Sequence, residues 1–113
     1  MIVHDLYPKP LAKAQFKLLY YKEVPKYAGC YVLTTFDDEI IYIGLAVNLY
    51  NRFKQHLDNP EKVSPNTFGK AVWFYYQAYD SSNLPKLERS WLNQYLNIHG
   101  KLPSLNKVFS PIN

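Results

Sequence analysis

The sequence predicts a single α+β domain, in which helices pack on a small antiparallel or mixed sheet. Its 113 residues suffice for one ordinary domain and leave no room for a second. Two segments rich in β-branched and aromatic residues, at 30–35 and 39–43, flank a polar tetrapeptide, a pattern typical of a β-hairpin. Helical spacing of apolar residues at 48–57, and again from about 84 to 99, predicts two helices.

The N-terminal segment is expected to add a helix. Residues 1–10 carry prolines at positions 8 and 10 and are expected to be extended. From Leu11 to Tyr21 the composition favours a helix, and Pro10 suits its first turn. The candidate apolar contacts of this helix are Leu11, Phe16, Leu19 and Tyr20.

The hairpin brings two tyrosines together if its turn is centred at 37–38. Leu33 then lies opposite Tyr42, and Tyr31 lies opposite Gly44. Because side chains alternate along a strand and opposed residues share a face, Tyr31 and Tyr42 become diagonal neighbours roughly 7 Å apart. Two phenols at that distance either bracket a small ligand or form an ordinary core pair.

The helix predicted over 48–57 has Asn48 as its N-cap candidate and an apolar row that starts at Leu49. Arg52 and His56 form the neighbouring row at four-residue spacing and border the buried side. An arginine there can fork onto a phosphate, and a histidine can exchange a proton near neutral pH. The alternative is two solvated polar residues beside a core row.

A carboxylate stands out in the last helix. Residues 58–69 are expected to be a loop, 71–79 a strand, and 81–83 the N-cap region of a helix that stops at Gly100. Helical spacing places Glu88 inside the apolar stripe of this helix. Burying an unpaired charge is costly, so Glu88 is either paired with a basic residue at the rim or serves as a metal ligand or general acid or base. The stripe consists of Leu84, Leu87, Trp91, Leu92, Tyr95 and Leu96.

Composition narrows the functional classes. The net charge of +4, from 13 basic and 9 acidic residues, is compatible with a polyanionic partner. The lone Cys30 excludes an internal disulfide and a zinc-finger site, and a reducing, cytoplasmic setting is expected. No segment has the length of a signal peptide or membrane span, so no membrane partner is expected.

The order and spacing of these residues resemble the GIY-YIG nuclease superfamily. Gly29-Cys30-Tyr31 is followed after ten residues by Tyr42-Ile43-Gly44, then by Arg52 and His56. The run YIGLAVNLYNRFKQHL is especially similar, and the GCY form of the first triplet is similar to that of the nuclease subunit of bacterial excision repair. The resemblance covers 29–107 and implies a three-stranded antiparallel sheet with helices around it. Residues 1–28 would then be an extension.

The resemblance implies catalytic roles for two tyrosines, an arginine and a histidine. Tyr31 matches the tyrosine thought to help activate the attacking water. Tyr42 matches the second tyrosine, which positions the site and shares that role. Arg52 matches the arginine that steadies the scissile phosphate, and His56 matches a polar residue that assists proton handling. Any of Tyr31, Tyr42 and His56 could be the general base. A tyrosine base would need nearby positive charge, because its ordinary pKa is near 10.

The resemblance also implies a metal site and phosphate contacts. Glu88 matches the single carboxylate that holds one divalent ion, expected to be Mg²⁺, with Mn²⁺ as a substitute. Asn106 is the candidate for a late asparagine of the family. Arg52, Lys54 and Lys107 are expected to contact nucleic acid, although Lys107 is equally well explained as a solvated residue. Cys30 replaces a common isoleucine, and we expect it to point away from Tyr31 as a small buried residue.

The expected function is therefore metal-dependent hydrolysis of DNA. An ion and an arginine both stabilise the charge that develops on the phosphoryl oxygens. The alternatives are a nucleic-acid-binding module of the same fold that no longer cuts, a hydrolase of another phosphate ester, or an interaction domain. Substrate preference in this family usually comes from an appended domain, so a protein partner, a homodimer or a structured DNA target is expected here.

Overall fold

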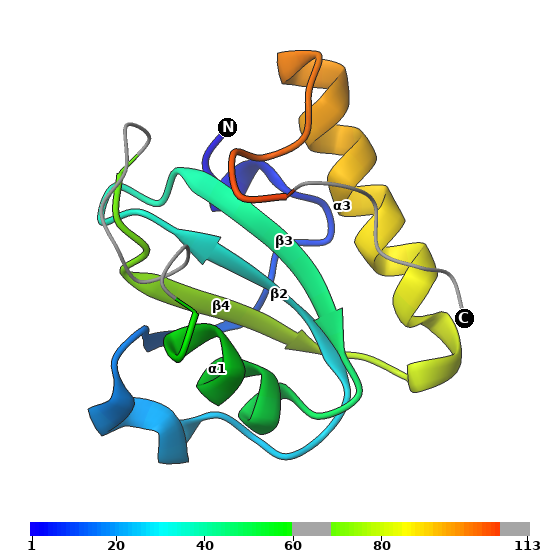
Figure 1. Ribbon diagram of the computed structural model, residues 1–113. Coiled ribbons are helices and arrows are strands. Elements are labelled where there is room, and N and C mark those ends of the chain that lie inside the picture. Colours follow the sequence, from blue (N-terminus) through cyan, green and yellow to red (C-terminus); the bar gives the residue numbers. More distant parts are fainter. Residues whose placement is uncertain (60–68, 107–113) are drawn as a thin grey trace.

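A four-stranded antiparallel sheet forms the centre of the fold (Figure 1). The computed structural model describes residues 1–59 and 69–106. The strands lie in the order β1-β4-β2-β3 and comprise β1 (Ala12–Gln15), β2 (Gly29–Thr34), β3 (Ile40–Ala46) and β4 (Trp73–Ala78). The α-helices are α1 (Leu49–Leu57) and α3 (Leu84–His99), and the 3₁₀ helices are η1 (Val3–Asp5), η2 (Leu18–Glu23) and η3 (Ser81–Asn83).

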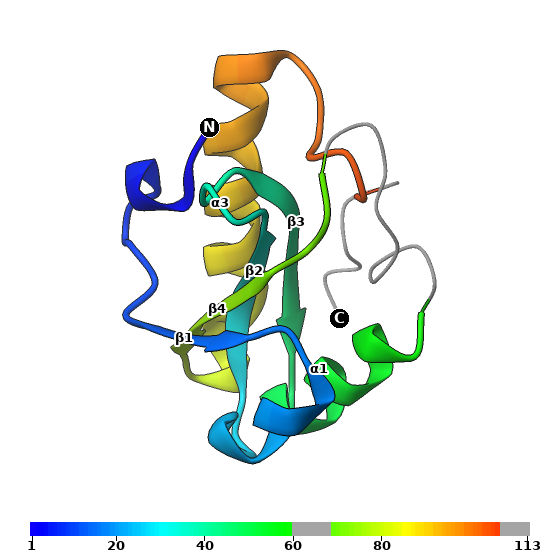
Figure 2. The same ribbon diagram turned by 90° about the vertical axis from the view of Figure 1, so that its left-hand side faces the viewer.

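The sheet separates two hydrophobic cores, one under each α-helix. Strand β2 is buried along its whole length, and its residues alternate between the two sides. Cys30 and Val32 pack with the apolar residues of α3, whereas Tyr31 and Leu33 pack with those of α1. Figure 2 shows the two helices on different sides of the sheet. The α+β fold predicted from the sequence is thus confirmed, but the sheet has four strands and not the three that the resemblance implies, because β1 adds to the edge of β4.

The predicted hairpin register is confirmed. Tyr31 pairs with Gly44, and Leu33 pairs with Tyr42. The register shifts between Leu33 and Thr34, on the turn side of these pairs, so the pairing of Tyr31 and Leu33 is unaffected. In the turn Asp38 adopts a positive φ of 66°, a conformation for which aspartate is better suited than most residues.

Both α-helices begin and end as predicted. The side chain of Asn48 accepts a hydrogen bond from the Asn51 amide at 3.0 Å and so caps α1. Gly100 ends α3 in the left-handed conformation, with its amide donating to the Leu96 carbonyl at 2.7 Å. Most of the loop predicted at 58–69 lies outside the described residues. No helix in the described part of the chain has the length and apolar character that a bilayer span requires.

The helix predicted over 11–21 is wrong. Strand β1 and the 3₁₀ helix η2 occupy this segment. The strand pairs with the open edge of β4, which gives its backbone hydrogen-bond partners, buries Ala14 and places the Lys13 ammonium 4.0 Å from the Trp73 ring centroid. Leu19, predicted as a core contact, is 80% exposed. Pairing with a distant strand therefore outweighed a weak local preference for helix.

Candidate active site

Tyr31 lies at the centre of an aromatic cluster on the α1 side of the sheet. Because β2 lies between β4 and β3, the ring has a neighbour on each strand. It stacks on Phe74 of β4 with centroids 4.9 Å apart, and on Tyr42 of β3 with centroids 6.0 Å apart. Tyr31 is fully buried and Tyr42 is half-buried, so Tyr42 is the phenol of this pair that reaches solvent.

Helix α1 supplies the polar side chains of the cluster. Arg52 and His56 lie one turn apart on it. Nε2 of His56 lies 2.5 Å from the Tyr31 hydroxyl, in a hydrogen bond whose direction depends on the imidazole tautomer. The Tyr31 hydroxyl also interacts with the Arg52 guanidinium and with the Tyr42 hydroxyl. The structure thus brings together four of the predicted site residues around one hydroxyl group.

The Tyr31 hydroxyl is protonated at neutral pH. Burial is the largest cause that raises its pKa well above the ordinary value of 10.0, and the neighbouring Tyr42 raises this pKa further. The charge of Arg52 favours the phenolate and opposes the shift without offsetting it. A proton acceptor at this site is therefore not a preformed Tyr31 phenolate.

Gly44 leaves the space that the Tyr31 ring occupies. A Cβ atom built on Gly44 would lie 2.5 Å from the Tyr31 hydroxyl oxygen, 2.6 Å from Cζ of Tyr31 and 2.9 Å from Cε1 of Tyr42. Contacts this short displace one of the two rings. The absence of a side chain at position 44 therefore allows Tyr31 to reach His56.

Asn106 secures the edge strand beside these tyrosines. Its Oδ1 accepts from the Ile43 amide at 2.9 Å, and its Nδ2 donates to the Ile43 carbonyl at 2.8 Å. The Leu105 amide donates to the Ile41 carbonyl at 2.9 Å, so the segment continues as a partner along the outer edge of β3. Both polar atoms of the Asn106 side chain thus form hydrogen bonds with the backbone of Ile43, which lies between Tyr42 and Gly44. Asn106 is therefore a positioning residue.

Glu88 lies on α3, the helix that covers the other face of the sheet. Its side chain is 1% exposed, which confirms the predicted position inside the apolar stripe. Its carboxylate acts electrostatically on the thiol of Cys30. Among the described residues no three His, Cys, Asp or Glu side chains converge as a metal site. A divalent ion held by Glu88 would take its other ligands from water and phosphate oxygens, a hard donor set that fits Mg²⁺ or Mn²⁺.

Cys30 is buried on the α3 side of the sheet, opposite the side of Tyr31, as expected. Burial is the main cause that raises its pKa from 9.0 to about 12, and the charge of Glu88 adds to the effect. We expect no thiolate absorbance from the folded protein at pH 10, and a clear signal after unfolding at that pH. A folded protein whose thiol titrates near pH 9 would contradict this burial.

The same shift predicts alkaline destabilisation. Because the folded state holds the proton more tightly, stability is fully present below pH 9 and falls as pH rises from 9 towards 12. The thiol alone contributes a slope of at most about 1.4 kcal/mol per pH unit. Thermal melts from pH 7 to 11 measure this loss, and Cys30→Val should flatten the curve between pH 9 and 10.

Of the two lysines predicted to contact nucleic acid, the structure describes only Lys54. Lys54 is exposed on α1, with its ammonium 5.0 Å from the ring centroid of Tyr21 and 5.6 Å from that of Tyr50. Lys107 lies outside the described residues.

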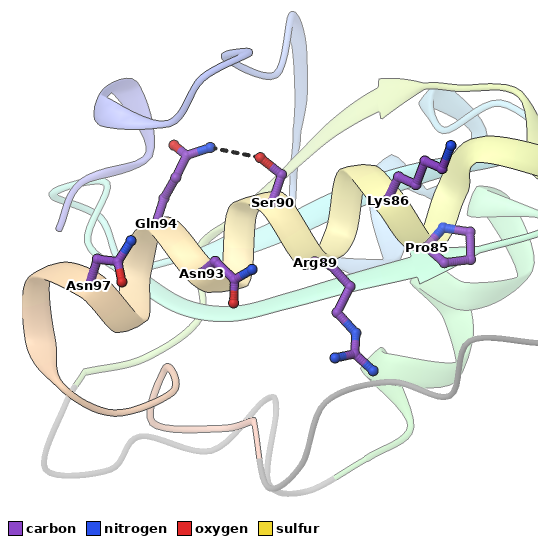
Figure 3. A pocket seen from close by; sticks show the side chains of 7 residues that line it. All are labelled: Pro85, Lys86, Arg89, Ser90, Asn93, Gln94 and Asn97. Carbon is purple, nitrogen blue, oxygen red and sulfur yellow. Dashed lines mark hydrogen bonds between the residues drawn. The ribbon is translucent and has the colours of Figure 1, made fainter.

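A surface pocket of about 570 Å³ lies elsewhere, on the outer face of α3 (Figure 3). Among the described residues that line it, none is a carboxylate or a histidine, and none is a predicted site residue. We therefore place the candidate active site at the Tyr31 cluster. The pocket is lined by Pro85, Lys86, Arg89, Ser90, Asn93, Gln94 and Asn97.

One member of the site was not predicted. Phe74 forms the second stacking surface of Tyr31, with the two ring planes only 12° apart. Alternation along the strand predicted at 71–79 shows which residues share a face with Phe74. It does not show whether that face of the sheet is the one that carries Tyr31, because this depends on how the strand pairs with β2. The order of strands in the sheet carries this information, and the local sequence does not.

Comparison with known proteins gives one family match and several relatives. The GIY-YIG catalytic domain family matches residues 27–101. The chain is 29% identical over 76 residues to UvrABC system protein C of Mycoplasma genitalium, covering 66% of this chain and 13% of that protein. It is 41% identical over 46 residues to the protein of the same name from Bdellovibrio bacteriovorus, covering 41% and 7%. The Prochlorococcus marinus protein is 37% identical over 43 residues, covering 38% and 7%.

These relatives are much longer, since the chain matches 7% to 13% of their lengths. The family match, by contrast, spans more than half of this chain and includes both tyrosine triplets, Arg52, His56 and Glu88. The chain therefore belongs to the GIY-YIG nuclease family.

Proposed function

We propose that this protein is a metal-dependent endonuclease that hydrolyses phosphodiester bonds in DNA. The observation that carries the proposal is the convergence of Arg52 and His56 on the buried Tyr31 hydroxyl, next to the half-exposed Tyr42. In water attack on a phosphate, a cation stabilises the charge on the phosphoryl oxygens, and a histidine or a phenol accepts the proton of the water. Similarity to UvrABC system protein C supports a nucleic-acid substrate.

The contacts support a proton path that ends on His56. The oxygen of water attacks phosphorus, the leaving oxygen departs with the electron pair of the broken bond and takes a proton from solvent, and the attacking water loses a proton. Tyr42 is the phenol that reaches solvent, so it takes this proton while passing its own to Tyr31. Tyr31 in turn passes its proton to Nε2 of His56. No phenolate accumulates on this path, in keeping with the raised pKa of Tyr31.

Arg52 and Glu88 have separate electrostatic tasks in this proposal. Arg52 stabilises the negative charge that develops on the phosphoryl oxygens. Glu88 is the carboxylate that would hold the divalent ion, and a bound ion would neutralise charge on the phosphate and leaving oxygens.

A nicking assay tests the proposal directly. Supercoiled plasmid and labelled branched or single-stranded DNA are incubated with the protein in Mg²⁺ or Mn²⁺, with Glu88→Ala purified in parallel. We expect cleavage by the wild type that disappears in the variant. Salt-sensitive binding of DNA without cleavage of any substrate would instead indicate a binding module that no longer cuts.

Gly44→Ala is expected to lower the cutting rate by about 100-fold or more, because the new methyl group displaces the Tyr31 ring. Overpacking should also lower stability by about 1–3 kcal/mol. Plasmid nicking and thermal melts measure the two effects.

Gly100→Ala is the matched control for this variant. Gly100 has a φ of 71° and open space around its Cα, so alanine should cost about 1–2 kcal/mol of stability and leave cutting intact. Wild-type cutting by Gly44→Ala would show that the position of Tyr31 is unimportant for activity.

A further inference from the structure

Lysines and tyrosines form a compact patch on the outer side of α1 and η2. The rings of Tyr21 and Tyr50 lie with centroids 5.6 Å apart. Lys54 lies over both rings, Lys26 lies 4.9 Å from the Tyr50 centroid, and Lys22 lies 6.0 Å from the Tyr21 centroid. We call these five residues the lysine–tyrosine patch. Its three lysines are exposed, and its two tyrosines are half-buried.

The extension that precedes the family-matched region supplies more than half of this patch. Residues 21, 22 and 26 lie before the matched range of 27–101, whereas 50 and 54 lie on α1 within it. The extension is fastened to the start of α1, because the Leu49 amide donates to the Tyr27 carbonyl and the Tyr50 amide to the Pro25 carbonyl, both at 3.0 Å. Figures 1 and 2 both show η2 beside α1.

The patch concentrates positive charge, and none of the ion pairs found among residues 1–59 and 69–106 neutralises it. Three ammonium groups share two adjacent rings, so they lie close enough to repel one another. The ion pairs formed by the described residues join Met1 to Glu39 and His4 to Asp38, and neither involves a patch lysine. Glu23 is the acidic residue of the 21–28 segment, against two lysines there. A polyanion lying across the patch would relieve this repulsion.

The ring faces indicate how the polyanion would bind. Ammonium groups lie over the tyrosine rings, so a base that stacked on the same ring faces would have to displace lysines. Phosphate oxygens, by contrast, would meet the ammonium groups where they already lie. The patch is therefore suited to a sugar–phosphate backbone.

We propose that the lysine–tyrosine patch binds the phosphate backbone of the DNA strand that flanks the scissile phosphate. This inference rests on the proposed nuclease function and locates its substrate. Lys54 and Arg52 lie two positions apart on α1, and so on different sides of the helix. An α-helix is about 10 Å across, and a strand carries one phosphate per about 3.4 Å of helix axis, so a strand crossing α1 would place roughly three phosphates between Arg52 and the patch.

The test compares two triple variants with the same change in charge. One is Lys22→Gln, Lys26→Gln and Lys54→Gln, and the control is Lys9→Gln, Lys70→Gln and Lys86→Gln, three exposed lysines outside the patch. Fluorescence anisotropy with a labelled 30-nucleotide duplex and single strand, in Ca²⁺ and at several salt concentrations, measures affinity and its salt dependence. Plasmid nicking in Mg²⁺ is measured on the same preparations.

The patch variant should bind DNA about 10- to 100-fold more weakly at 0.1 M salt, with the slope of log affinity against log salt reduced by about 2 to 3. The control should lose less than one unit of slope. Equal binding by the two triple variants, with wild-type nicking intact, would overturn the patch and leave the nuclease proposal standing. Wild-type protein that neither binds nor nicks DNA would overturn the nuclease proposal itself. Patch-dependent binding of polyglutamate as tight as that of DNA would assign the patch to acidic proteins and overturn the inference.

Discussion

Arg52→Ala is expected to lower the rate of DNA cleavage by about 100- to 10,000-fold while leaving the domain folded. Arg52 is half-buried beside the apolar row of α1, and its guanidinium interacts with the Tyr31 hydroxyl. Removing it withdraws the cation nearest to the proposed site of attack, and each tenfold loss of rate corresponds to about 1.4 kcal/mol of transition-state stabilisation. The fold should survive because Leu49 and Phe53, which fill the core under α1, are untouched.

Nicking rates at saturating DNA and circular dichroism melts separate the two effects. Gln55→Ala, an exposed change on the same helix, is the control for altered helix composition. Arg52→Lys keeps the charge but loses the two-pronged geometry, so it should recover only part of the activity. A collapse of the melt in Arg52→Ala would mean that Arg52 is structural and would remove its proposed role.

The tyrosine pair could be predicted from the sequence because strand alternation is a strict local rule. Once the turn fixes the register, Tyr31 must share a face with Tyr42 and lie opposite Gly44, and the structure shows this arrangement. The row of Arg52 and His56 on α1 follows from helical spacing in the same way. What spacing could not give is the convergence of both side chains on one buried hydroxyl, since that depends on how α1 packs over the sheet.

Non-local pairing explains what the sequence did not reveal. Ala12–Gln15 forms a strand only because β4 offers an open edge some sixty residues later in the chain. Asn106 was identified by its type and approximate position, but its two hydrogen bonds to the backbone of Ile43 depend on the edge of β3 being open. In both cases a backbone edge created by the folded sheet selects the conformation of a distant segment.

Glu88→Gln is expected to abolish cleavage at every Mg²⁺ or Mn²⁺ concentration, by about 1,000-fold or more, because it removes the proposed carboxylate ligand while keeping the shape of the side chain. The fold should persist, since replacing a charge that is 1% exposed with a neutral amide of similar volume leaves no cavity. Metal titrations of nicking activity measure the loss, and isothermal calorimetry with Mn²⁺ measures binding without reference to activity. Glu23→Gln, at an exposed glutamate, is the matched control.

Cys30 provides a second readout that does not depend on cutting. The charge of Glu88 helps to raise the pKa of this thiol, so Glu88→Gln should lower it from about 12, and thiolate absorbance should appear at lower pH. A lowered thiol pKa together with undiminished cleavage would show that Glu88 is charged and buried yet is not the metal ligand. A folded Glu88→Gln variant could instead lose both cleavage and Mn²⁺ binding and show a lowered thiol pKa. In that case the Glu88 carboxylate both holds the metal and raises the pKa of Cys30. That result would also mean that the ion acts from α3, on the opposite side of the sheet from α1 and Arg52.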